Sequence, residues 1–131
     1  MNKLPLQKKT QIISLLVEGN SIRATSRITG ASKDTVSSLL VKVGKACQQF
    51  HNDNVIRIAA ERVQCDEIWS FVGCKEKAKS QGADGQGDVW TWVGIDADTK
   101  LVVSWLVGDR DTETAIVFMQ DIKDRVKIGF N

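Results

Sequence analysis

The chain has 131 residues, a formal net charge of +2 and a hydrophobic fraction of 42%, which suits one ordinary domain or two small ones with a packed core. No apolar run approaches the roughly 18 residues of a transmembrane helix, and the first residues lack a signal-peptide pattern. The three cysteines (Cys47, Cys65 and Cys74) form no CxxC pair and no even set. We therefore expect neither a cysteine-based zinc site nor a disulfide framework, and we expect a cytoplasmic protein without a membrane partner.

Charge is distributed unevenly along the chain. Residues 1–50 contain eight Lys or Arg and only two acids, Glu18 and Asp34, whereas residues 51–131 contain ten bases and fourteen acids. This division predicts a basic domain at residues 1–50, a linker at residues 51–62 and an acidic domain at residues 63–131. Only the first has the charge that attracts a polyanion. The lone histidine, His51, is more simply a surface residue than a ligand or a base.

The N-terminal domain is expected to be helical. Pro5 stands near the start of a first helix, Ile12, Leu15 and Leu16 form its apolar face, and Gly19 ends it. A second stretch then predicts a helix-turn-helix, or at least a helical hairpin with a solvated basic face.

The helix-turn-helix prediction depends on the residues around one glycine. A helix from Ser21 to about Thr29 meets Gly30, and the next helix restarts after Ser32, a favourable N-cap. Small Ser26 precedes the glycine at the point where the two helices would cross. The apolar residues expected to face inward from the second helix are Val36, Leu39, Leu40 and Val43.

This arrangement predicts how the domain would contact double-stranded DNA. The second helix of a helix-turn-helix enters the major groove with its N-terminal residues at the base edges. Arg23 and Arg27, one turn apart on the preceding helix, are placed to hold phosphates. The residues expected to contact DNA are Arg23, Arg27, Ser32, Lys33, Thr35, Ser37, Ser38 and Lys42.

The C-terminal domain is predicted to contain three antiparallel strands and a helix. The strand-like stretches are RVQCDEIWSFVG, VWTWVGIDA and KLVVSWLVGD, separated by the polar loop KEKAKSQGADGQGD and by an ADTK turn. Asp111 then caps a helix at residues 112–126, with Ile116, Met119, Ile122 and Val126 on its apolar side. The fold class is therefore α+β, with an antiparallel meander covered on one face.

The strands and the polar loop contain residues with two possible roles. Four tryptophans (Trp69, Trp90, Trp92 and Trp105) lie in the strands, where core packing and cross-strand pairing are favoured over a base-stacking platform. The loop's three lysines, at positions 75, 77 and 79, contact a DNA backbone or form a solvated hairpin tip.

Two adjacent carboxylates, Asp66 and Glu67, stand in the middle of the first strand. Because alternate side chains of a strand face opposite ways, only one of them can enter a given site. The other belongs to solvent or to a salt bridge. A single strand Asp is more often an edge or bulge residue than a catalyst, and a buried unpaired carboxylate is costly.

The stretches CDEIWSFVG and WTWVGIDADTKLVVSWLVGDRDTETA, following a helix-turn-helix, resemble bacterial insertion-sequence transposases of the Asp-Asp-Glu group, insertion sequence 1 being the closest type. The resemblance spans residues 8–127 and implies a ribonuclease-H-like catalytic domain. It makes Asp66 a catalytic residue and a ligand of Mg²⁺ or Mn²⁺, so that cations neutralise a buried carboxylate. It also implies cleavage and strand transfer at the element's terminal repeats by a homo-oligomer that holds two ends.

The chain departs from this family in two respects. No counterpart of the family's N-terminal zinc-binding segment is found, and none of the later acids (Asp96, Asp98, Asp109 and Asp111) matches the family's second Asp or final Glu. We therefore expect a truncated transposase with a partial ribonuclease-H-like unit, which binds DNA but is catalytically incomplete and holds no metal stably. The final IGFN is expected to be a tail added by a frame change or truncation. The alternatives are a helix-turn-helix regulator acting at the element's ends and an inactive remnant.

Overall fold

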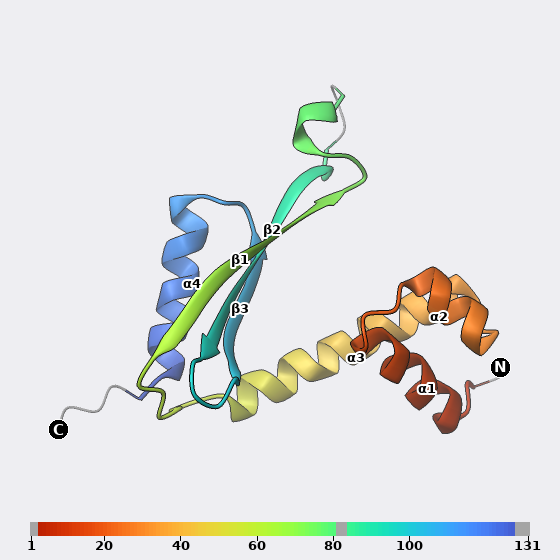
Figure 1. Ribbon diagram of the computed structural model, residues 1–131, viewed down its shortest axis with the longest axis horizontal. Coiled ribbons are helices and arrows are strands. Elements are labelled where there is room, and N and C mark those ends of the chain that lie inside the picture. The colour runs from red at the N-terminus through yellow and green to blue at the C-terminus, as the bar shows by residue number, and fades with distance from the viewer. Residues whose placement is uncertain (1–2, 81–83, 128–131) are drawn as a thin grey trace. The chain divides into compact units, whose positions relative to one another are not determined.

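The chain divides into two compact units, Met1–Asp53 and Asn54–Asn131. The computed structural model describes residues 3–80 and 84–127. The final IGFN and the middle of the polar loop lie outside these residues. Within the described part, four α-helices and a three-stranded antiparallel sheet confirm the predicted α+β class (Figure 1).

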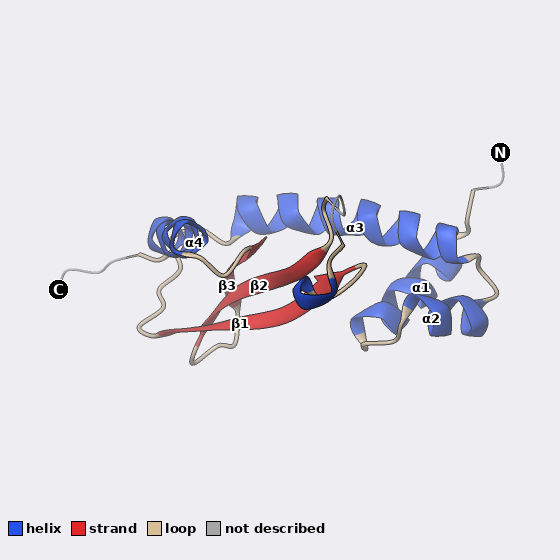
Figure 2. Ribbon diagram, turned by 90° about the horizontal axis from the view of Figure 1, so that it is seen from above, coloured by secondary structure: helices blue, strands red, loops and turns tan. Residues whose placement is uncertain are grey.

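The first unit contains α1 (Leu6–Val17), α2 (Ile22–Thr29) and nearly all of α3 (Lys33–Asn54). Figure 2 shows α1 and α2 beside the N-terminal half of α3. The buried centre is small and consists of Ile12, Val36 and two threonines, Thr25 and Thr29. Because so few side chains are buried, contacts between helix ends are important for holding the three helices together. One such contact is the hydrogen bond that the Lys8 ammonium donates to the carbonyl of Thr29, at the last residue of α2.

The long helix α3 differs from the sequence prediction at two points. It continues to Asn54, so the first four residues of the expected linker, 51–54, are helical. Leu40 is 41% exposed rather than turned inward, whereas Val36 is fully buried and Leu39 and Val43 are half-buried. The buried stripe of α3 is therefore narrower than predicted.

The second unit is built on a meander. Strands β1 (Val63–Val72), β2 (Gly87–Asp96) and β3 (Val102–Gly108) pair antiparallel in the order β1-β2-β3. The short 3₁₀ helix η1 (Glu76–Ala78) lies in the loop between β1 and β2. The predicted ADTK turn joins β2 to β3, with Lys100 in the left-handed region at φ 65°. The order of the strands agrees with the sequence prediction.

Helix α4 (Thr112–Arg125) covers one face of this sheet (Figure 1). A Cβ on Gly94 of β2 would stand only 3.0 Å from Ile122 Cδ1 and 3.4 Å from the ring of Phe118, so glycine permits this close approach. The predicted apolar side of α4 was wrong in part. Ile116 is 63% exposed and Met119 54% exposed, while Phe118 and Ile122 are buried.

Apolar residues occur on both sides of α4, so the hydrophobic pattern alone does not choose its buried side. Polar contacts are found on the side that is buried. Ser104 of β3, fully buried, donates to Asp121 on the inward side of the helix, and Arg125 donates to the same carboxylate. On this same side of α4, Phe118 and Ile122 are buried, whereas Met119 is exposed.

The prediction that the tryptophans serve in core packing and cross-strand pairing is confirmed only in part. Trp69 and Trp90 are cross-strand partners, and Trp92 contacts Phe118 with ring centroids 5.8 Å apart. Trp92 also donates through Nε1 to the carbonyl of Asp109. Trp69 and Trp105 remain substantially exposed.

None of the helices within residues 3–80 and 84–127 has the length and apolar character needed to cross a membrane.

Candidate functional site

The turn between α2 and α3 is stabilised by side-chain hydroxyl groups. Gly30 occupies the left-handed region at φ 72°, a conformation that a residue with a side chain rarely adopts. Ser26 donates to the carbonyl of Ala31, and Thr29 accepts from the amide of Ala31 while donating to the carbonyl of Thr25. The small Ser26 is thus needed for its hydroxyl group as well as its size. Together these bonds determine the angle at which α3 leaves the turn.

The start of α3 is capped as the sequence predicts. The Ser32 hydroxyl accepts a hydrogen bond from the amide of Thr35 at 3.1 Å. It also shares a hydrogen bond with the hydroxyl of Thr35, with 2.8 Å between the two oxygens. Two of the residues expected to contact DNA therefore already hydrogen-bond each other, and their hydroxyl groups have less capacity for a base edge than Ser38.

Most of the expected DNA-contacting residues are accessible. Arg23, Arg27, Lys33 and Ser38 are exposed. Within the described residues, no ion pair joins a Lys or Arg of positions 3–54 to an acid. Among the described residues, the lysines and arginines of this unit therefore have no acidic partner. The remaining expected residues comprise exposed Ser32 and Lys42 and half-buried Thr35 and Ser37.

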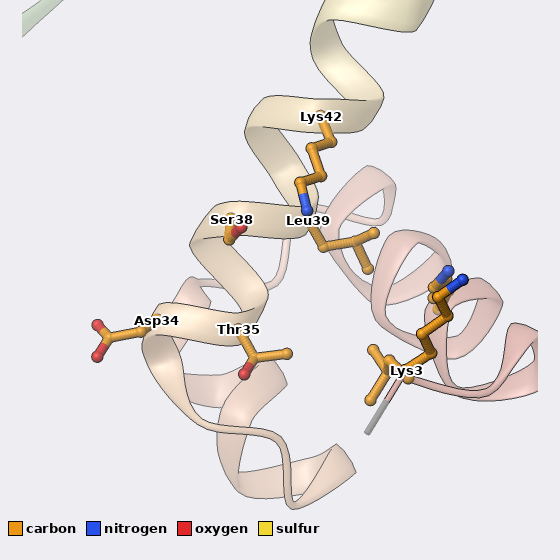
Figure 3. Close-up of a pocket in the computed structure, with 8 residues that line it drawn as sticks. Lys3, Asp34, Thr35, Ser38, Leu39 and Lys42 are labelled. Carbon is orange, nitrogen blue, oxygen red and sulfur yellow. The ribbon is translucent and has the colours of Figure 1, made fainter. Parts of the chain in front are cut away.

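A cleft of about 550 Å³ brings some of these residues together with others that the sequence analysis did not select (Figure 3). Thr35, Ser38 and Lys42 lie three to four residues apart along α3 and share one side of it. They line the cleft opposite Lys3 and Lys9. Leu4 and Leu39 provide apolar lining, and Asp34 provides the one carboxylate. Arg23, Arg27, Ser32, Lys33 and Ser37 lie outside it.

Lys3 and Lys9 were not predicted as DNA contacts because both lie outside the helix-turn-helix segment. The signal was present, since the basic stretch at positions 3, 8 and 9 contributes three of the eight cations of residues 1–50. Sequence did not distinguish the neighbours Lys8 and Lys9. The structure does, because Lys8 bonds the end of α2 whereas Lys9 lines the cleft.

The expectation of a buried carboxylate at Asp66 was wrong. Asp66 is exposed, and its Oδ1 accepts a hydrogen bond from the amide of Glu67. The reason is its register. Asp66 pairs with Val93, whereas its neighbour Cys65 pairs with Gly94, the residue against which α4 packs. Asp66 therefore faces away from α4, on an edge strand of the three-stranded sheet.

Glu67 has a different partner, as expected from the alternation of side chains along a strand. It lies 3.5 Å from the guanidinium of Arg110, which also stands over the ring of Trp90. Glu67 is therefore the strand acid that forms a salt bridge.

A shallow cleft of about 380 Å³ lies beside Asp66 and is otherwise lined by neutral side chains, among them Cys65, Val93 and Ile95. Desolvation raises the pKa of the Cys65 thiol, which disfavours the thiolate form that binds metals. Within the described residues, no group of three or more His, Cys, Asp or Glu is placed to hold a metal ion. Asp66 alone does not fit the pair of divalent cations that the family resemblance implies.

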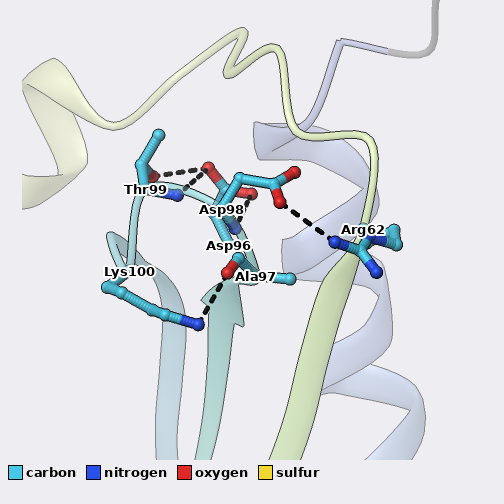
Figure 4. Close-up of polar contacts among 6 residues, drawn as sticks. All are labelled: Arg62, Asp96, Ala97, Asp98, Thr99 and Lys100. Atoms are coloured by element: carbon cyan, nitrogen blue, oxygen red, sulfur yellow. Dashed lines mark hydrogen bonds and ion pairs between the residues drawn. The ribbon is translucent and has the colours of Figure 1, made fainter.

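The other acids considered as ligands occupy turn and capping positions, as the sequence analysis expected. Asp96 is buried and accepts from the hydroxyl and amide of Thr99 and from the amide of Asp98 (Figure 4). The hydroxyl bond from Thr99 is the main reason that the pKa of Asp96 is lowered. Asp98 pairs with the exposed Arg62 at 3.0 Å.

Asp111 is the N-cap of α4, and its carboxylate accepts from the amide of Thr114 at 2.8 Å. This bond lowers the pKa of Asp111. These carboxylates stabilise the ends of secondary-structure elements, and none of them lines the cleft of Asp66.

Comparisons of the chain with protein-family models, with curated proteins and with solved structures find no match.

Proposed function

We propose that residues 3–54 bind double-stranded DNA as the helix-turn-helix of an insertion-sequence transposase of the Asp-Asp-Glu group. The observation that carries this proposal is the turn between α2 and α3. Left-handed Gly30 and capping Ser32 fix two helices around a short turn, and the cations nearby lack acidic partners among the described residues.

The exposed side chains suggest a division of roles on the DNA. Arg23 and Arg27 on α2 are placed to hold phosphates, which orient a protein on DNA without reading sequence. Ser38, whose hydroxyl is exposed on α3, is suited to a base edge because hydroxyl groups both donate and accept. Lys33, in the first turn of α3, is suited to the O6 and N7 atoms of guanine.

For the second unit, we propose the opening part of a ribonuclease-H-like domain in which Asp66 is a ligand of Mg²⁺ or Mn²⁺, acting within a homo-oligomer on the terminal repeats. The support is its place on β1 of a β1-β2-β3-α4 arrangement. The described residues supply no second acid beside Asp66. We therefore derive no cleavage step from them.

A second candidate function is a DNA-binding regulator that occupies the element's ends without cutting them. It is favoured by the isolation of Asp66 among neutral residues, and by the engagement of Asp96 and Asp111 as turn and helix caps. The two candidates share the DNA-binding unit and differ only in the role of the strand carboxylate.

Selection of bound duplexes from a random 25-base-pair pool tests the shared proposal. The full chain should enrich a consensus sequence. Ser38→Ala should weaken discrimination at one base pair by about 1 kcal/mol, whereas Arg27→Gln should weaken all sequences alike and lower the salt slope of log K by about 0.9. Binding without any enriched sequence would overturn the proposal of specific recognition.

The selected duplex then separates the two candidate functions. It is incubated with the chain and Mg²⁺ or Mn²⁺, and nicked product is measured for the unchanged chain and for Asp66→Asn. Nicking that Asp66→Asn abolishes while duplex binding is retained would support catalysis by this chain. Binding with no nicking by either protein is the result expected from a single carboxylate, and it would leave DNA binding without cleavage as the function of this chain.

A further inference from the structure

The cleft between α3 and the N-terminal segment has an arrangement of charge that the proposed helix-turn-helix contacts do not explain. Three ammonium groups line it, from Lys3 before α1, Lys9 on α1 and Lys42 on α3. No ion pair to these lysines occurs among the described residues. Like charges around one cleft repel each other, and a bound anion removes that repulsion.

The lone carboxylate of the cleft does not neutralise the lysines. Asp34 stands in the first turn of α3, and Figure 3 shows its side chain pointing away from Lys3 and Lys42. The charge of the cleft is therefore divided, with the ammonium groups of Lys3 and Lys42 on one side and the Asp34 carboxylate turned away from them. An anion is attracted to the first side and repelled from the second.

The lining also indicates what kind of anion fits. A volume of about 550 Å³ is large enough for a group of nucleotide size. Leu4 and Leu39 provide apolar surface for a sugar. Lysine carries a compact charge with rotatable donors, which suits a phosphate oxygen better than the planar edge of a base.

We infer that this cleft seats a backbone phosphate of the bound DNA, held by Lys3, Lys9 and Lys42. The inference rests on the proposed DNA binding and adds a contact outside the helix-turn-helix itself. It assigns Lys42 to the backbone rather than to a base edge. It also gives α1 a direct part in binding, because Lys9 contacts DNA while its neighbour Lys8 holds α2.

The test measures the affinity of the full chain for a mixed-sequence 20-base-pair DNA duplex by fluorescence anisotropy, at salt concentrations from 50 to 200 mM. Each phosphate contact contributes about 0.9 to the slope of log K against log salt. The double variant Lys9→Gln/Lys42→Gln should lower the slope by about 1.8. Its drop in affinity over this fourfold salt range should be about 12-fold smaller than that of the unchanged chain.

The matched control is Lys123→Gln, which removes one exposed lysine from α4 in the second unit and should leave the slope unchanged. Far-UV circular dichroism verifies that both proteins are folded. If the double variant and the unchanged chain had equal salt slopes while both still bound DNA, the phosphate contact in this cleft would be overturned. The proposed DNA binding would stand. Failure of the unchanged chain to bind any duplex DNA overturns the proposed function as well. Tighter binding of an RNA duplex of the same sequence also overturns the assignment to DNA.

Discussion

The two units of the chain use their charged side chains in opposite ways. In residues 3–54 the cations have no acidic partners among the described residues, and only Lys8 is used for an internal hydrogen bond. In the second unit several acids have internal partners: Glu67 pairs with Arg110, and Asp96 and Asp111 cap a turn and a helix. Charged side chains attract a partner of opposite charge only where contacts within the protein do not already engage them. The sequence shows the surplus, whereas the structure shows which groups are available.

The largest expected effect tests whether the second unit depends on apolar packing more than on its engaged acids. Phe118→Ala should lower the free energy of unfolding of this unit by about 3–5 kcal/mol, since it leaves a cavity against Trp92 and Gly94. Urea unfolding followed by tryptophan fluorescence measures this unit alone, because all four tryptophans lie within it. The control Met119→Ala removes an exposed side chain and should change the value by less than about 0.5 kcal/mol. If both variants lost the same free energy of unfolding, Met119 would be packed inward, as the sequence predicted.

A smaller effect tests whether Lys8 differs from the available cations of the first unit. Lys8→Met removes a charge-assisted hydrogen bond to the end of α2 and should cost about 1.5 kcal/mol of stability. Thermal unfolding followed by circular dichroism at 222 nm measures it. Lys9→Met is the matched neighbour, and it should retain stability while losing DNA affinity. If Lys8→Met left the stability unchanged, Lys8 would not differ from Lys9 in its contribution to the fold.

The smallest effect concerns acid pH and the engaged carboxylates. Because the Thr99 hydroxyl lowers the pKa of Asp96 from its ordinary 3.8, native Asp96 stays ionised at pH values where the unfolded chain takes up a proton. Its contribution to stability is therefore complete above the ordinary pKa and is lost as the pH falls through the lower native pKa. The melting temperature of the second unit should hold from pH 7 to about pH 5 and fall below about pH 4.

Asp96→Asn should reduce that acid-dependent decline, because the titrating group is absent. Asp124→Asn, at an exposed position of α4, is the control and should keep the decline of the unchanged chain. An identical pH profile in Asp96→Asn and the unchanged chain would show that the Asp96 turn does not cause the acid sensitivity.

The elements that could be predicted from sequence are those determined by local chemistry. Ser21, Gly30, Ser32 and Asp111 mark helix ends through caps and a left-handed turn, and the structure places the helix boundaries at these residues. The ADTK turn and the order of three strands follow from equally short-range signals. Such features depend on hydrogen bonds between residues a few positions apart, and these can be read directly from the sequence.

The features that could not be predicted depend on contacts between distant residues. The buried side of α4 depends on contacts with the sheet, such as the packing of Phe118 and Ile122 against Gly94 and the bond from Ser104 to Asp121, 17 positions apart. The exposure of Asp66 follows from which strand residues face α4. The lysine cleft joins residues 3 and 9 to residue 42. Residue spacing within one element contains no information on any of these.

The closing contact of the second unit has a consequence for the synthesis of the chain. The segment before β1 is held by the end of α4: Arg125 donates to the carbonyl of Val55, and backbone hydrogen bonds join Ile58 to Arg125 and Lys127. The bond from Arg125 to Val55 spans 70 positions. A ribosome adding about 5–20 residues per second needs roughly 4–14 s to make that stretch. During that time the helical unit can already be folded, while the start of the sheet is not yet in contact with its last helix.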